Sequence, residues 1–179
     1  IGAMPADGPA MLVAVHMPAQ FTKQFAERLD GLCAMDVVEA QEGMPVLTGR
    51  AIIAPGDRHL TIKRMGAGYV CKLEKGPRVQ GHVPSVNVLF DSVASEAGNG
   101  AIGIVLTGMG RDGAIGLRAM RDAGALTACQ DEATSLIYGM PGAAVAEGAV
   151  SVQLPVSDIP AFILRNLATR QAAKQRVGA

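Results

Sequence analysis

The stretch from 101 to 130, AIGIVLTGMGRDGAIGLRAMRDAGALTACQ, decides the fold of this chain. Its first apolar run, Ala101 to Leu106, predicts a strand buried on both faces, as in a parallel sheet. A loop then leads to Gly113, a helix is expected over Ala114 to Ala123, and a second strand over Leu126 to Gln130. Strand, helix and strand in this order indicate a parallel βαβ unit.

The same alternation continues on both sides of this unit. Met11 to Val15 is another short apolar run, and the residues after it recur at helical spacing: Phe21, Phe25, Leu29 and Leu32. Pro84 and Ser85 can start and cap a further helix that Gly98 closes. A last amphipathic helix begins near Pro155 and extends to Leu167.

The middle third of the chain has a different pattern. Short apolar pieces at 51–54, 59–62 and 69–73 alternate with turn signals, which predicts antiparallel hairpins. We therefore expect an α/β protein with a mainly parallel doubly wound sheet, helices on both faces and an antiparallel hairpin edge. One domain is expected over 1–168, followed by a polar and frayed tail over 169–179.

Composition excludes several classes of function. Sixteen basic and sixteen acidic residues give a formal net charge of zero, so no overall field draws the domain to nucleic acid. No apolar run approaches the roughly 18 residues of a membrane span, so we expect no membrane insertion. Three distant cysteines (Cys33, Cys71 and Cys129) fit neither a disulfide framework nor a zinc site, and they favour a cytoplasmic location.

Two residues that follow predicted strands are candidates for catalysis. His16 comes after the strand Met11 to Val15, and Asp112 lies in the loop after the strand Ala101 to Leu106. Ligands of open parallel sheets bind at the carboxyl ends of the strands, so these side chains can meet there. An aspartate that orients a histidine is the arrangement that activates a hydroxyl nucleophile. A histidine hydrogen-bonded at the rim of the core is the alternative for His16.

The loop after Leu106 also supports a rival function. Gly108 to Gly113 reads G-x-G-x-x-G, and Asp131 lies at the end of the next strand, where a dinucleotide fold holds a ribose. Against a nucleotide-binding module, the carboxylate of Asp112 would lie within the loop that must cradle a pyrophosphate. Because His16, His59 and His82 show no metal-ligand spacing, we expect neither a metal nor a cofactor.

Several blocks of residues together resemble the CheB methylesterases, the protein-glutamate methylesterases of bacterial chemotaxis. The blocks appear in the family's order and spacing: His16 to Thr22, Phe25 to Leu29, Ile53 to Asp57, Pro84 to Val86 with Val88 to Phe90, Leu106 to Gly113, and Gly139 to Pro141. The resemblance covers the chain from Met4 to about Leu167. Val83 and Asn87 depart from the family pattern, where arginine and aspartate are expected, and we expect this to affect substrate-side detail alone.

The resemblance implies a serine hydrolase that acts in bacterial chemotaxis, which is a two-component signalling system. It would cleave methyl esters from glutamate side chains of chemoreceptors and also deamidate receptor glutamines. His16 would be the catalytic histidine, Asp112 the catalytic aspartate, and Met109 would line the site near the oxyanion. The implied partners are the methylated cytoplasmic domains of chemoreceptors and an amino-terminal receiver domain. The start of the chain at Ile1 is compatible with removal of that receiver domain.

The nucleophile is the main departure from the family, which continues after Ile-Gly-Ala with Ser-Thr-Gly-Gly. Here Ala3 is followed at once by Met4. If Ile1 to Ala3 ended one parallel strand and Met11 began the next, seven residues would replace a crossover of roughly a dozen or more. We therefore expect that the serine segment is missing between Ala3 and Met4. A true deletion would leave a catalytically dead or nucleotide-binding module.

The remaining serines are poor substitutes for that nucleophile. Ser85 is expected to cap a helix, Ser92 and Ser95 lie within that helix, and Ser157 starts another. Ser135 precedes the loop at Gly139 but lacks any elbow-like surroundings.

Overall fold

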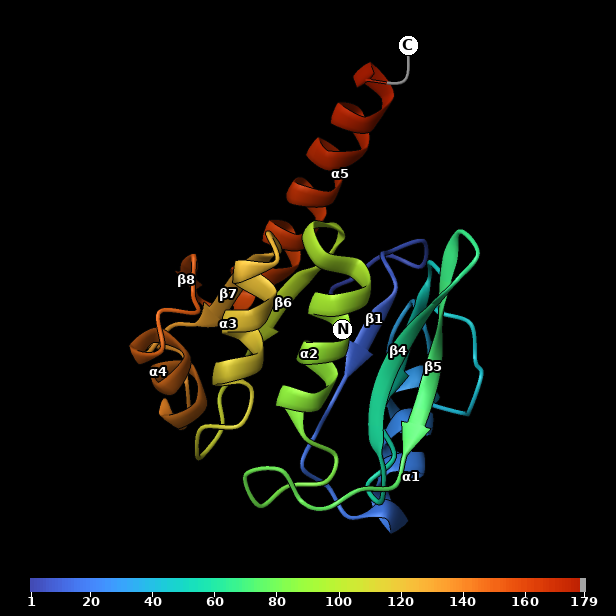
Figure 1. The fold of residues 1–179 in the computed structure, drawn as a ribbon, viewed down its shortest axis with the longest axis vertical. Coiled ribbons are helices and arrows are strands. Elements are labelled where there is room, and N and C mark those ends of the chain that lie inside the picture. Colours follow the sequence, from blue (N-terminus) through green and yellow to red (C-terminus); the bar gives the residue numbers. More distant parts are fainter. Residues whose placement is uncertain (178–179) are drawn as a thin grey trace.

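A computed structural model describes the backbone of residues 1–177 and the side chains of 1–167 and of Thr169 (Figure 1). Its strands form two parallel three-stranded sheets and one antiparallel hairpin. The first sheet has the order β1 (Met11–Val13), β3 (Arg50–Ile53) and β2 (Asp36–Glu39). The second has the order β6 (Ile102–Val105), β7 (Leu126–Gln130) and β8 (Val152–Leu154). The hairpin pairs β4 (His59–Met65) with β5 (Gly68–Glu74).

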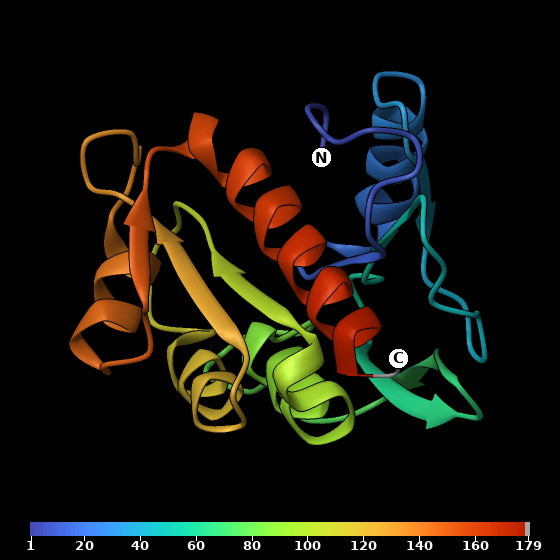
Figure 2. The ribbon, with the colours of Figure 1, turned by 90° about the horizontal axis from the view of Figure 1, so that it is seen from above.

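Helices cover both faces of these sheets, as Figure 2 shows for α5 on the side opposite α2 and α3. The five α-helices of the described chain are α1 (Ala19–Asp30), α2 (Val86–Ala97), α3 (Ala114–Asp122), α4 (Gly139–Ala146) and α5 (Ile159–Val177). Two short 3₁₀ turns precede β6 and α5, at Gly98–Gly100 and Val156–Asp158. The predicted α/β class, with a parallel arrangement, helices on both faces and an antiparallel hairpin, is confirmed.

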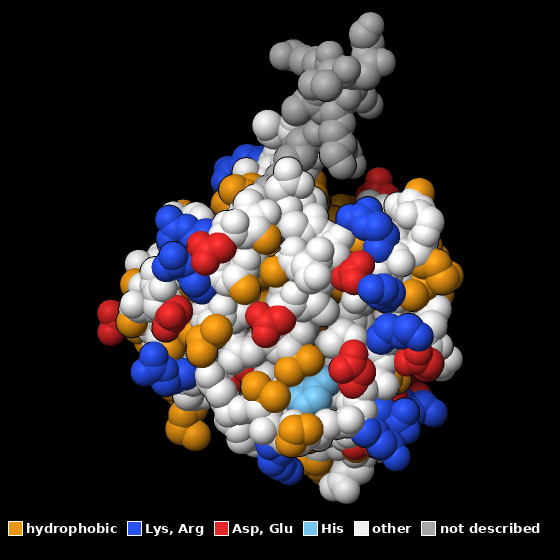
Figure 3. All heavy atoms as spheres, in the orientation of Figure 1, with side chains coloured by type: hydrophobic (Ala, Val, Ile, Leu, Met, Phe, Trp, Pro, Cys, Tyr) orange, Lys and Arg blue, Asp and Glu red, His pale blue; other side chains and the backbone are white. Residues whose placement is uncertain are grey.

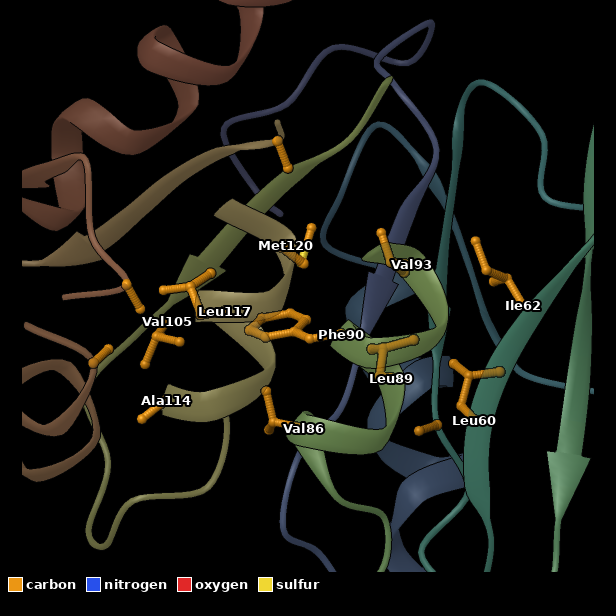
Figure 4. Close-up of a cluster of buried hydrophobic side chains, with 14 of the residues drawn as sticks. Leu60, Ile62, Val86, Leu89, Phe90, Val93, Val105, Ala114, Leu117 and Met120 are labelled. Carbon is orange, nitrogen blue, oxygen red and sulfur yellow. The ribbon is translucent and has the colours of Figure 1, made fainter. Parts of the chain in front are cut away.

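The largest core lies around α2, between α3 and the hairpin. In Figure 4, Phe90 of α2 points towards Leu117 and Met120 of α3, while Leu89 faces Leu60 of β4. These side chains are almost fully buried, which follows from the apolar face that the sequence of α2 repeats at helical spacing. The hairpin is therefore attached to the sheets through α2.

Residues of β3 alternate between two cores. Ala51 and Ile53 pack on the α1 side, whereas Ile52 and Ala54 belong to the core around α2. All four are fully buried, as a central strand of a parallel sheet requires. The prediction that 51–54 forms part of a hairpin is wrong, because β3 pairs in parallel with both β1 and β2. Only the segments that became β4 and β5 form the expected hairpin.

Other local predictions also need correction. Ile1 to Ala3 do not end a strand, since the N–H of Met4 donates to the carbonyl of Ile1 and closes a turn. No sequence pattern predicts β2, α4 or β8, and the block from Gly139 starts a helix rather than a loop. Helix α5 continues to Val177, so most of the expected polar tail is helical, and 178–179 lie outside the described residues.

The carboxyl ends of β1 and β6 lead into the segments that carry the candidate residues. β1 ends three residues before His16, and β6 ends before the loop that reaches Asp112. No helix within the described part of the chain is long and apolar enough to cross a membrane.

Candidate active site

His16 and Asp112 meet although 96 positions separate them in the chain. The distance from His16 Nε2 to Asp112 Oδ2 is 2.7 Å. The aspartate side chain is fully buried, whereas 23% of the histidine side chain is exposed. The predicted contact between these two residues therefore exists, with the carboxylate inside the protein and the imidazole at its surface.

Ser85 and the first two residues of α2 supply three more hydrogen-bond donors to Asp112. The Ser85 hydroxyl donates to Oδ1 at 2.7 Å, the Asn87 N–H to Oδ1 at 3.0 Å and the Val86 N–H to Oδ2 at 2.8 Å. Burial by itself raises the pKa of Asp112, but the hydrogen bonds from His16 and from the start of α2 outweigh it and lower the pKa to about 2. The carboxylate is thus held ionised at a helix N-terminus.

The contact with Asp112 decides which ring nitrogen of His16 is available for chemistry. An ionised carboxylate only accepts hydrogen bonds, so Nε2 carries the proton that it donates to Asp112. Nδ1 is then the unprotonated nitrogen of the neutral ring. The geometry makes Nδ1 the atom that can take a proton from a nucleophile, and Asp112 stabilises the resulting imidazolium.

A second histidine covers one face of the His16 ring. The rings of His82 and His16 are stacked with centroids 3.7 Å apart and planes 9° from parallel. Burial lowers the pKa of His82, and the charge of His16 lowers it further. Figure 3 shows histidine surface, in pale blue, beside hydrophobic side chains on this face of the molecule. The stack restrains the plane of the His16 ring without adding a positive charge at neutral pH.

The backbone after His16 is held in place by the loop that contains Gly56. The N–H of Gly56 donates to the buried Thr22 hydroxyl at 3.2 Å, and that hydroxyl donates to Glu39 at 2.6 Å. A Cβ atom at Gly56 would lie 2.3 Å from the carbonyl oxygen of Met17. The loop after β3 therefore fits directly against the residue after His16, and only glycine permits this approach.

The G-x-G-x-x-G loop is closed to a pyrophosphate. The Asn87 side-chain oxygen accepts hydrogen bonds from the N–H groups of Gly113, at 3.0 Å, and Gly116, at 2.8 Å. These are the amides at the start of α3 that would cradle a phosphate. Asp131, the proposed ribose ligand, instead accepts from Thr134 within its own loop. The nucleotide-binding alternative is not favoured.

The expectation that Asn87, as a departure from the family pattern, affects only substrate-side detail is wrong. The residue is buried, with 5% exposure. Its side chain joins the N-terminus of α2 to that of α3, and its N–H donates to Asp112. Asn87 therefore belongs to the support of the His16–Asp112 pair.

Met109, the predicted site-lining residue, is 77% exposed in the same loop as Asp112. The loop is fixed to the opposite segment because Gly108 and Tyr138 form a parallel bridge, and the Thr107 hydroxyl donates to the carbonyl of Ile137. The place of Met109 beside the oxyanion stays a prediction.

The other candidate nucleophiles are occupied or unreactive. Ser85 is the N-cap residue of α2, as expected, but its buried hydroxyl makes no cap hydrogen bond and donates to Asp112, which itself receives the first N–H groups of that helix. The hydroxyls of Ser92 and Ser135 donate to backbone carbonyls. Burial raises the pKa of the Cys71 and Cys129 thiols to about 11, which keeps them protonated.

Among the described residues, no three His, Cys, Asp or Glu side chains are grouped so that they could hold a metal ion. Residues that sequence reasoning missed are the supporting ones: Thr22, Gly56, His59, His82 and Asn87. The sequence shows His59 and His82 as histidines, but their spacing bears only on metal ligation. Their contacts join segments remote in sequence, so spacing carried no signal of them.

A buried aspartate that orients a surface histidine is also the arrangement found in hydrolases that use a hydroxyl nucleophile. A family model described as CheB methylesterase matches residues 1–163. The chain belongs to the CheB methylesterase family.

Individual relatives agree with this assignment. A protein-glutamate methylesterase/protein-glutamine glutaminase of Cupriavidus pinatubonensis is 49% identical over 174 residues, which is 97% of this chain and 49% of the relative. A similarly named protein of Rhodospirillum rubrum is 52% identical over 163 residues, covering 91% of this chain and 45% of the relative. The chain thus spans about half the length of the curated relatives it matches.

The fold comparison gives the same family. The crystal structure of the Thermotoga maritima CheB methylesterase catalytic domain superimposes with a TM-score of 0.89 at 33% sequence identity. The match covers 92% of this chain and 88% of that domain.

Proposed function

We propose that this chain is the catalytic part of a protein-glutamate methylesterase that also deamidates protein glutamines. The observation that carries the proposal is the 2.7 Å contact between His16 Nε2 and Asp112 Oδ2, within a fold of the CheB family. The names of the relatives supply the two reactions. The proposed substrates are methylated glutamate and glutamine side chains of chemoreceptors, in the cytoplasm.

In the proposed mechanism, a serine hydroxyl attacks the ester carbonyl while His16 Nδ1 takes its proton. Asp112 remains ionised and stabilises the imidazolium, which its low pKa favours. His16 then protonates the leaving methoxide, and methanol departs from the acyl-enzyme. Water attacks the acyl group in the second step, His16 again accepts a proton, and the glutamate and the serine are released. Deamidation follows the same course with ammonia as the leaving group.

The serine of this mechanism is expected directly after Ala3 and is not in the sequence. That a segment carrying it is missing between Ala3 and Met4 stays a prediction. The serines at 85, 92 and 135 are engaged as described above, which supports a nucleophile from outside the present sequence. A receiver domain before the catalytic part remains part of the proposal, in keeping with relatives about twice as long.

The decisive experiment measures methanol release from methylated chemoreceptor by two proteins. One is the present chain, and the other carries after Ala3 the matching segment of the Cupriavidus relative, which is expected to begin with Ser-Thr-Gly-Gly. We expect hydrolysis only with the second protein. His16→Ala and Asp112→Ala in that protein should each reduce kcat by about a thousandfold or more.

Asp122→Ala is the matched control for these variants, because Asp122 is an exposed carboxylate on α3 paired with Arg118. It should leave the rate unchanged. Equal hydrolysis by the present chain would place the nucleophile elsewhere, and an active His16→Ala variant would remove His16 from the mechanism.

A further inference from the structure

His59 is a buried histidine that lies behind Asp112 and takes no part in the mechanism above. It is the first residue of β4 and is only 4% exposed. Its Nδ1 receives the N–H of Ser85 at 3.1 Å, and its Nε2 lies 3.0 Å from the carbonyl oxygen of Pro77. Both ring nitrogens are therefore used.

The partners of His59 determine its tautomer. The Ser85 N–H is only a donor, so Nδ1 must be unprotonated, and the Pro77 carbonyl is only an acceptor, so Nε2 must carry the proton. The two contacts together therefore select the Nε2–H tautomer. A hydrogen on Nδ1 would face the Ser85 N–H and break the bond between them.

Ser85 links His59 to the His16–Asp112 pair. Its N–H binds His59, and its hydroxyl donates to Asp112 Oδ1 at 2.7 Å. The other oxygen of the same carboxylate receives His16. Ser85 is fully buried, so water does not replace either bond.

We propose that His59 is a positioning residue for the His16–Asp112 pair. By accepting the Ser85 N–H, it sets the backbone at the start of α2 so that the Ser85 hydroxyl, the Val86 N–H and the Asn87 N–H converge on one carboxylate. The proposal goes beyond the proposed function but rests on it for the catalytic value of the pair. The positioning itself concerns contacts that the present chain contains.

The competing explanation is purely structural. Through Nε2, His59 also anchors the segment 75–77, and a Cβ at Gly76 would lie 3.4 Å from its ring. If that anchor were its whole role, the Nε2 contact would matter and the Nδ1 contact would not. The two roles thus use different atoms of one side chain, so they can be separated.

Two substitutions separate these atoms. In His59→Asn, the amide oxygen can occupy the position of Nδ1 and still accept the Ser85 N–H, while the contact with Pro77 is lost. In His59→Gln, the amide nitrogen can occupy the position of Nε2 and still donate to Pro77, while the acceptor for Ser85 is lost. Each variant loses one hydrogen bond, so both should be destabilised to a similar extent.

The measurement is the exchange with water of the His16 Nε2 proton, followed by NMR of the ring-labelled chain. Three histidines give three ring systems, which His16→Ala and His82→Ala assign. We expect exchange to be about tenfold faster in His59→Gln and within about twofold of the original chain in His59→Asn. In a Ser85→Ala background the Gln substitution should add less, because one of the three donors that His59 positions is already gone.

Faster exchange in the Asn variant rather than the Gln variant would overturn the proposal in favour of the anchor. Equal effects in both, or no effect in either, would also overturn it. Because the readout is a ring proton of the existing chain, it is independent of hydrolysis. Failure of the methylesterase assay would leave this result unaltered, and the reverse also holds.

Discussion

The two halves of the His16–Asp112 pair are held in different ways. Asp112 is 1% exposed and receives four hydrogen bonds, three of them from consecutive residues at the start of α2. Within the described chain, the His16 ring makes one hydrogen bond, to Asp112. It is otherwise restrained by the stacked ring of His82. Its backbone, rather than its side chain, is fixed, through the approach of Gly56 to Met17.

This difference matches what each group must do in the proposed mechanism. The carboxylate keeps its charge and position throughout, so complete preorganisation costs nothing during the reaction. The imidazole must gain and lose a proton at Nδ1 and meet substrate, so that side of the ring has to remain accessible. The comparison predicts that damage around Asp112 or to the backbone beside His16 appears as lost stability, while changes to the His16 side chain appear mainly in the titration of His82 and in the rate.

The largest effect is expected from Asp112→Ala. The substitution leaves the N–H groups of Val86 and Asn87 and the hydroxyl of Ser85 without their acceptor in a buried site. We expect a loss of about 3 kcal/mol in the free energy of unfolding, measured by urea denaturation. The matched variant Asp122→Ala removes an exposed ion pair and should cost less than about 0.5 kcal/mol. Similar losses in the two variants would contradict the difference described above.

A slightly smaller loss is expected where the backbone beneath His16 is clamped. In Gly56→Ala the new methyl group would meet backbone atoms 2.3 and 2.4 Å away, in Met17 and Ala19, which cannot move as a side chain would. We expect a loss of about 2 to 3 kcal/mol in thermal or urea unfolding. Gly31→Ala is the control, since its nearest atom is 3.8 Å away and its φ is −68°. An unchanged free energy of unfolding in Gly56→Ala would show that the close approach of residue 56 to Met17 and Ala19 is not needed.

Protonation of Asp112 at low pH should lower the free energy of unfolding by about 2 kcal/mol. The pKa of Asp112 is about 2 in the folded protein against 3.8 ordinarily, so its contribution is complete above about pH 4 and is lost as the pH falls through 2. Urea unfolding at pH 5 and at pH 2 should show this loss in the original chain. The corresponding difference should be smaller by that amount in Asp112→Asn, and an unchanged pH dependence would refute the assignment.

The smallest effect concerns the stacked rings. Burial lowers the pKa of His82 and the charge of His16 adds to this, so His16→Ala should raise the pKa of His82 towards 6.5. NMR titration of the His82 ring protons measures the change. Arg78→Ala removes a weaker repulsive charge and should raise the same pKa less. If the pKa of His82 were the same in His16→Ala as in the original chain, the two rings would not interact in solution.

Much of the fold could be predicted from local patterns. The apolar run before Leu106 and the helical spacing in α2 gave correct elements, because burial on both faces and a 3.6-residue repeat leave a direct trace in sequence. The run at 51–54 had the same trace, but the turn signal at Pro55 favoured a hairpin, whereas its true partners are the earlier strands β1 and β2, with which it pairs in parallel. Strand pairing is decided between segments, so short strands such as β2 and β8 escaped prediction.

The candidate site divides in the same manner. That His16 and Asp112 follow parallel strands was enough to predict that they meet. The supports were not predictable, because Ser85, assigned as a cap, turned out to donate to the residue that does the capping. Asn87, assigned to substrate-side detail, joins two helices.

The sequence by itself determined the family, the α/β class and the two residues of the pair, since each depends on order and spacing along the chain. Tertiary structure alone decided that Nδ1 of His16 is the free nitrogen, that the glycine-rich loop is closed by Asn87 and that His59 supports Ser85. The physical reason is that hydrogen-bond direction and burial arise where separate elements converge. A carboxylate between two helix N-termini acquires its low pKa only there.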